Sequence, residues 1–283
     1  MDFLFQGLRI SAPYVLCALG GAVGERAGVI QLGLEGMLLL GAFFATVGAE
    51  YGGVLGGIAA GAVGGIALAG IYGLAVLRGR ADQVVASVAI NLLALGFTRY
   101  LLKLLYQSAS NSPRVPGFDS SVETGLFLAA TALIAVGVQV WLSRTPGGLH
   151  LRAVGEHPEA AHSLGARVVI IRAEAVLVSG LFAGLGGAWL ALDNHGFVDR
   201  MSGGRGYIAL AAVIFGRWSP LGAAGACLLF GFADALQLRL QTSGPFPREL
   251  VQILPYVLTI IAVAGVVGRS RAPAALGRPW GAG

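Results

Sequence analysis

The sequence predicts an all-α fold, a polytopic bundle of about eight to ten transmembrane helices. Of its 283 residues, 56% are hydrophobic and only 12% are charged, which is about half the charged fraction of a soluble domain. The mean hydropathy is +0.77, and apolar runs close to the roughly 20 residues needed to cross hydrocarbon recur along the chain. The 45 glycines favour close packing of helices inside a membrane.

Eight long apolar runs predict the spans in order, and a shorter run predicts a further span or half-span. The long runs lie near residues 9–24, 33–50, 54–77, 83–102, 125–142, 169–192, 219–240 and 247–267, and the shorter one near 206–216. The runs follow one another without a soluble insert of domain size. We therefore predict a single transmembrane domain over residues 1–283.

The distribution of arginine predicts the orientation of the chain. If the spans alternate and the N-terminus is outside, most arginines fall on one side, which the positive-inside rule assigns to the cytoplasm. These are Arg78, Arg80, Arg144, Arg152, Arg167, Arg172, Arg217, Arg269, Arg271 and Arg278. A basic cytoplasmic tail is therefore expected over residues 268–283. The opposite loops hold fewer basic residues: Lys103, Arg114, Arg200 and Arg205.

Small residues form two ridges at helical spacing. Gly57, Gly61, Gly65, Ala69 and Gly73 recur every four residues in the third run, and the later set is Gly180, Gly184 and Ala188. Such ridges let a neighbouring backbone approach closely. Static helix packing and a moving helix–helix surface both remain open as interpretations.

The sequence lacks the motifs of several kinds of chemistry. It has no glycine-rich phosphate loop ending in Lys-Ser/Thr, and Lys103 is the only lysine, so any ATP must be used by a partner. His157 and His162 have poor spacing for one helical face and predict solvated loop residues rather than a metal site. Cys17 and Cys227 lie inside apolar runs, so no disulfide framework is expected. We predict no cofactor, no metal, no nucleic-acid binding and no enzymatic activity.

Polar residues inside the apolar runs are candidates for a substrate path, because such residues are costly in lipid. Glu35 and, four residues earlier, Gln31 lie in a stretch with glycines close by, where we expect broken or re-entrant backbone. Glu35 either accepts hydrogen bonds from exposed backbone N–H groups or an arginine such as Arg26, or lines the path. Asn91 either bonds a neighbouring helix or lines the path, and Gln83 either faces the interface or lines the path. A further run contains Asp234, which fits a structural partner.

The longest polar stretch on the predicted cytoplasmic side is the segment 143–168. Pro158 suits the first position of a helix and Gly165 the residue just past its end, while Glu159 would favourably meet the helix dipole. We expect a short helix parallel to the membrane that presents small residues and one leucine to another protein. A solvated connecting loop is the alternative.

Several stretches resemble the permeases of ABC importers for nucleosides and simple sugars, within the branched-chain amino acid and ribose permease family. They are residues 24–37 running on to 43, 81–85 with 89–96, 151–165, 204–222 and 254–259. Together they span most of the chain in the expected order. Gln31 departs from the Asn common in such permeases, and His157 from a small or polar residue.

The resemblance implies a type II-like permease that imports a nucleoside or related sugar by alternating access across a bacterial cytoplasmic membrane. It implies a second permease, related or identical, two ATPase subunits beneath, and an extracytoplasmic substrate-binding lipoprotein. It makes residues 155–165 the ATPase-coupling helix, namely Gly155, Glu156, Pro158, Glu159, Ala160, Ala161, Leu164 and Gly165. A stand-alone secondary transporter or channel is the alternative, although few intramembrane carboxylates are present for ion coupling.

Overall fold

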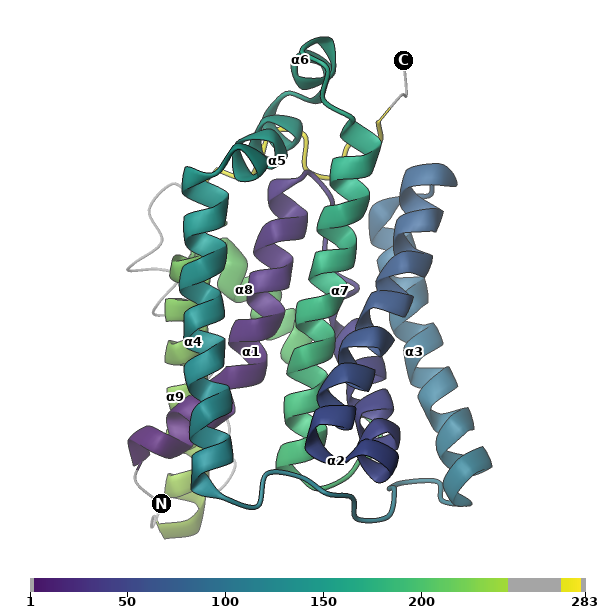
Figure 1. The fold of residues 1–283 in the computed structure, drawn as a ribbon, viewed down its shortest axis with the longest axis vertical. Helices are drawn as coiled ribbons and strands as arrows, with labels where there is room; N and C mark the ends of the chain where they lie inside the picture. Colours follow the sequence, from purple (N-terminus) through teal and green to yellow (C-terminus); the bar gives the residue numbers. More distant parts are fainter. Residues whose placement is uncertain (1–2, 244–270, 281–283) are drawn as a thin grey trace.

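The computed structural model describes residues 3–243 and 271–280 as helices joined by loops (Figure 1). The elements are α1 (Phe3–Arg26), α2 (Leu34–Gly73) with a π-helical turn (Leu74–Arg78), α3 (Gln83–Tyr106), α4 (Ser121–Arg144), α5 (Pro146–Glu156), α6 (Pro158–Ser163), α7 (Val168–Asp193), α8 (Arg205–Phe215) and α9 (Pro220–Ser243). Within these residues the only β pairing is one isolated bridge, between Asn111 and Val198. The predicted all-α class is confirmed.

Six of these helices are long and apolar enough to cross a membrane: α1, α2 with its π-helical turn, α3, α4, α7 and α9. The short run became α8, whose 11 residues rise only about 16 Å, roughly half the hydrocarbon thickness. It is therefore a half-span. The predicted span at 247–267 lies outside the described residues.

The helix α2 is a hairpin of two antiparallel arms, which match the separate runs predicted at 33–50 and 54–77. Its backbone leaves the helical region at Gly52 and Gly53, and Gly53 has φ 60° and ψ −158°, a combination essentially restricted to glycine. Contacts run in opposite directions along the arms: Gly48 faces Ala60, while Gly64 faces Phe44. One 40-residue helix thus crosses the membrane region twice.

The two small-residue ridges predicted from the sequence pack against each other. A side chain added to Gly65 on the second arm of α2 would meet the Gly180 carbonyl oxygen and lie 2.7 Å from Gly184 Cα on α7. One added to Gly61 would lie 2.8 Å from Ala188 Cβ. The α2–α7 backbones are close because neither ridge carries side chains large enough to separate them.

The helix ends define two sides of the bundle. One side, which we call the basic end, carries α5, α6 and residues 271–280 at the top of Figure 1. The loop from α3 to α4 runs along the other side, where Arg9 pairs with Asp193 and Tyr106 donates to Glu50. Between the ends, α1 lies among its neighbours and buries most of its length.

Candidate substrate cavity and coupling segment

Glu35 lies where two helices begin inside the bundle. It occupies the first turn of α2, because the chain is unwound over residues 27–33, as the flanking glycines predict. Its two carboxylate oxygens accept hydrogen bonds from the backbone N–H groups of Gly204 and Gly206, each at 2.8 Å. These N–H groups belong to the N-terminal end of α8, which has no intrahelical partner for them and carries the positive end of the helix dipole. One of the alternatives for Glu35, acceptance of hydrogen bonds from exposed backbone N–H groups, is present in the structure.

The close approach of α8 to Glu35 requires glycine. Gly204, the residue before α8, has φ 85°, in the left-handed region that other residues rarely adopt. A Cβ added to Gly206 would lie 2.5 Å from Glu35 Cα. Arg26 takes no part, since it donates instead to the carbonyls of Arg217 and Trp218.

Asn91 of α3 joins the same two elements. Its Oδ1 accepts from the N–H of Gly36 at 2.9 Å, and its Nδ2 donates to the carbonyl of Leu32 at 2.9 Å and to the hydroxyl of Tyr207 at 3.0 Å. One amide thus binds the segment before α2, the first turn of α2 and the first turn of α8. The interhelical amide predicted as one alternative is present.

A cavity of about 350 Å³ opens beside this junction. Its walls combine both helix starts with the loop before α8: Glu35, Gly36, Leu39, Asn91, Leu92, Leu95, Arg200, Ser202, Gly203, Gly204 and Tyr207. It combines an apolar wall with a few polar groups, which is the usual chemistry of a small-molecule site. Glu35 and Asn91 therefore both hold the structure and line this cavity.

Three polar residues of the cavity wall were not predicted as site residues: Arg200, Ser202 and Tyr207. Tyr207 is 47% exposed, and its hydroxyl is oriented by Asn91. The signal available in the sequence was the glycine-rich stretch 203–206, which breaks two apolar runs, but only the fold shows that this break meets the one before Glu35.

Gln31 and Gln83 lie outside the cavity wall. Gln83, 4% exposed, accepts from the N–H of Ile30 at 2.8 Å and so holds the segment 27–33. Gln31 is fully buried, and within the described residues its side-chain amide has no hydrogen-bond partner. Contact of either glutamine with substrate stays a prediction.

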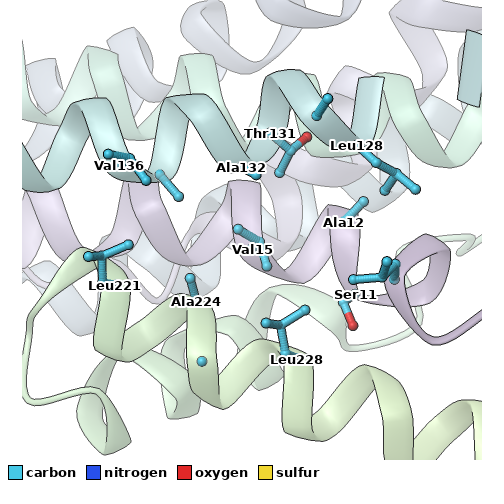
Figure 2. Close-up of a pocket in the computed structure, with 14 residues that line it drawn as sticks. Ser11, Ala12, Val15, Leu128, Thr131, Ala132, Val136, Leu221, Ala224 and Leu228 are labelled. Atoms are coloured by element: carbon cyan, nitrogen blue, oxygen red, sulfur yellow. The ribbon is translucent and has the colours of Figure 1, made fainter. Parts of the chain in front are cut away.

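A larger cavity of about 510 Å³ lies between α1, α4 and α9 (Figure 2). Its only hydroxyls, on Ser11 and Thr131, both donate to carbonyls of their own helices. The wall therefore offers no free hydrogen-bond donor to orient a polar solute. Its chemistry matches hydrocarbon.

The polar segment 143–168 forms two helices at the basic end. The predicted short helix is α6, which begins at Pro158, and Gly165 follows it with φ 89°. The preceding α5 was not predicted. Leu164 is 90% exposed, and Glu159, Ala160 and Gly165 are exposed beside it.

The remaining residues predicted for coupling are buried or bonded to other parts of this chain. Gly155, Pro158 and Ala161 are buried, and a side chain on Gly155 would collide with the carbonyl oxygen of Arg26. The exposed Glu156 accepts a hydrogen bond from the N–H of Ala274 at 3.2 Å. The exposed surface is therefore smaller than the set predicted from the sequence.

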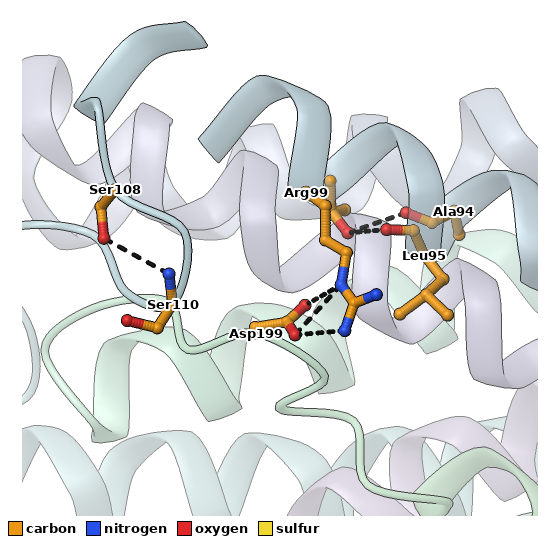
Figure 3. Close-up of polar contacts among 7 residues, drawn as sticks. Ala94, Leu95, Arg99, Ser108, Ser110 and Asp199 are labelled. Carbon is orange, nitrogen blue, oxygen red and sulfur yellow. Dashed lines mark hydrogen bonds and ion pairs between the residues drawn. The ribbon is translucent and has the colours of Figure 1, made fainter. Parts of the chain in front are cut away.

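An ion pair fixes the loop that supplies the cavity wall (Figure 3). Arg99 of α3 donates to both carboxylate oxygens of Asp199, at 2.9 Å from Nε to Oδ1 and 2.7 Å from Nη2 to Oδ2. Asp199 precedes Arg200 and lies three residues before Ser202. Hydrogen bonds and charge from Arg99 hold the pKa of Asp199 below its ordinary value.

We predict that Asp199→Asn causes a small, pH-dependent loss of thermal stability, because exposed ion pairs contribute little. A depressed pKa in the folded state stabilises the protein above the ordinary Asp pKa of about 3.9, and this stabilisation is lost as the pH falls through the lower folded pKa. The Tm difference from wild type should be constant between about pH 5 and 7 and shrink below about pH 4. A difference that grows on acidification would contradict this role.

A multi-helix membrane bundle in which a half-helix N-terminus meets a broken helix at a polar cavity has the architecture of a membrane transport protein. The family model described as the branched-chain amino acid transport system / permease component matches residues 3–263. The chain belongs to this family and is the permease component of an ABC transport system.

Three relatives align over most of the chain. The guanosine ABC transporter permease protein NupQ of Bacillus subtilis (strain 168) is 39% identical, covering 96% of this chain and 94% of the relative. The nucleoside ABC transporter permease protein NupC of Lactococcus lactis subsp. cremoris (strain MG1363) is 34% identical, covering 95% and 93%. The putative glucose ABC transporter permease protein TsgC13 of Haloferax volcanii is 36% identical, covering 83% and 76%.

Proposed function

We propose that this chain is one permease subunit of an ATP-driven importer that moves nucleosides across a bacterial plasma membrane into the cytoplasm by alternating access. The observation that carries the proposal is the near full-length similarity to two permeases named for guanosine or nucleosides. The 350 Å³ cavity supports it, because Asn91, Ser202, Arg200 and the ring of Tyr207 suit a solute with polar edges and an aromatic face.

The cavity also suggests which face meets a second permease, whether a related chain or a copy of this one. Glu35, Asn91 and Tyr207 lie at an opening between α3 and α8, and polar groups at membrane depth are costly when they face lipid. The α1–α4–α9 side, by contrast, is apolar. We therefore assign the α3–α8 face to the partner permease, with the substrate path running between the two chains.

The basic end is the proposed docking side for two ATPase subunits, and an extracytoplasmic binding lipoprotein delivers substrate to the opposite end. ATP hydrolysis is assigned to the ATPases because this chain lacks a phosphate-binding loop; the permease itself needs no cofactor. The exposed surface of α6 and Leu164 is small and protrudes, so it could fit a groove in the ATPase. Leu164 contributes most, because a large apolar side chain that is 90% exposed gains most from burial in a partner.

The test is co-purification of the ATPase with the complex, together with uptake of labelled guanosine into vesicles supplied with ATP. Leu164→Asp should reduce ATPase co-purification by at least about tenfold, or about 1.4 kcal/mol. Ala109→Asp adds the same charge to an exposed position at the opposite end and should leave docking unchanged. Normal docking of Leu164→Asp would overturn the assignment of α6, and uptake that persists without ATP would overturn the ATP-driven mechanism.

A further inference from the structure

The C-terminal residues 273–280, which we call the tail, bind the coupling helices at the basic end (Figure 1). The N–H of Ala275 donates to the carbonyl of Gly155 at 2.9 Å, and the N–H of Ala274 donates to Glu156. Trp280 packs edge-on against His162 of α6, with ring centroids 5.3 Å apart. The tail thus contacts both α5 and α6.

The same tail binds the unwound segment that leads to Glu35. The N–H of Gly277 donates to the carbonyl of Gly28 at 3.1 Å. Arg172 of α7 is 1% exposed and is hydrogen-bonded to both segments. Its Nε donates to the carbonyl of Ala27 in the unwound segment at 3.1 Å, and its Nη1 donates to the carbonyl of Arg278 in the tail at 2.9 Å. A buried guanidinium is costly unless its N–H groups are used. Within the described residues Nη2 of Arg172 has no hydrogen-bond partner, so the side chain depends on these two carbonyls, one from each segment.

The unwound segment, residues 27–33, leads along the chain from these contacts to Glu35 in the cavity wall. Two residues beyond Gly28, the N–H of Ile30 is held by Gln83, and the carbonyl of Leu32 is held by Asn91. Glu35 follows three residues later. Six residues therefore join Gly28 to Glu35, and two of them, Ile30 and Leu32, are hydrogen-bonded to α3.

Besides the tail, α5 touches this region directly at Gly155, against Arg26 and Gly28. The helix α6 packs on α5 through Ala161 and Val154, and it has a second connection to the region through Trp280 and the tail. We propose that the tail, clamped by Arg172, is an intramolecular brace that transmits movement of α5 and α6 to the segment 27–33 and hence to the Glu35 cavity. This inference rests on the proposed function, since it assumes that an ATPase moves α6. Arg172 is a positioning residue in this scheme and touches no substrate.

The test compares Arg172→Gln and Trp280→Ala in the full complex with matched controls. Arg167→Gln changes an exposed arginine five residues earlier, and Arg271→Ala an exposed residue at the start of the described C-terminal residues. Three quantities are measured: ATPase co-purification, ATP hydrolysis, and labelled guanosine uptake. Arg172→Lys is included because a single ammonium cannot reproduce the two-nitrogen clamp on separate carbonyls.

We expect docking and ATP hydrolysis within about twofold of wild type for Arg172→Gln, Arg172→Lys and Trp280→Ala, with uptake reduced at least about tenfold, a loss of coupling worth about 1.4 kcal/mol. Both controls should transport normally. Wild-type uptake by Trp280→Ala would overturn the brace, as would a parallel fall of docking and uptake in these variants, which a purely structural role predicts. If the wild-type complex itself shows no ATP-driven uptake, the proposed function fails, and this outcome is distinct from failure of the brace.

Discussion

Glu35→Gln is expected to reduce ATP-driven uptake by at least about tenfold. The carboxylate accepts from two backbone N–H groups at the start of α8, and bonds to a charged acceptor contribute about 1.5–3 kcal/mol each. A glutamine offers one acceptor oxygen and turns an NH₂ toward a second donor. The start of α8 then loses one partner and its favourable charge.

The matched control for this prediction is Glu50→Gln, the same change on the same helix. Glu50 is exposed at the opposite end and accepts from Tyr106, a contact that a glutamine oxygen can keep. Glu35→Asp retains the charge and should recover part of the uptake. Normal uptake by Glu35→Gln in vesicles with equal amounts of complex would show that the carboxylate charge is not needed.

Gly184→Val is expected to abolish recovery of folded permease. A Cβ on Gly184 would collide with the carbonyl oxygen of Gly61 and lie 3.1 Å from Gly65 Cα, so the obstacle is backbone that cannot rotate away. Overpacking costs about 1–3 kcal/mol where side chains can adjust, and two backbones in contact place this site at or above the upper end. The measurement is the fraction of detergent-solubilised protein that elutes as a single species.

Gly137→Val serves as the matched control for that substitution. Gly137 lies on α4, where an added Cβ meets no atom within 4 Å, so the same change should leave recovery near wild type. Equal recovery of both variants would mean that the ridge of small residues does not hold α2 against α7. Equal loss would instead point to valine itself as the cause.

The spans were predictable because the length of an apolar run and the spacing of small residues within it suffice to recognise a membrane-spanning helix. The runs predicted at 83–102 and 169–192 became α3 and α7 with ends shifted by at most four residues. The spacing of Gly61 and Gly65 marked one packing surface and that of Gly184 another. Nothing in either spacing shows that the two surfaces meet, because helix partners are chosen by contacts between residues more than 100 positions apart.

The candidate site was predictable only in part, for the same reason. Glu35 and Asn91 stand out because a polar group in an apolar run needs an explanation. Tyr207 does not stand out, since tyrosine is ordinary at the edge of a membrane span. Its place beside Asn91 depends on α8 beginning halfway across the bundle.

The sequence by itself determined that this chain is a membrane protein, the order of its spans, and the permease family to which it belongs. These are properties of local composition and of motifs read in order. Only the tertiary structure decided that the helix break before Glu35 meets the break before α8, and that the tail returns to the segment 27–33. Each of these hydrogen bonds uses at least one backbone N–H or carbonyl, groups that nearly every residue has. No pattern of side chains predicts which distant N–H group will donate to which carboxylate or carbonyl.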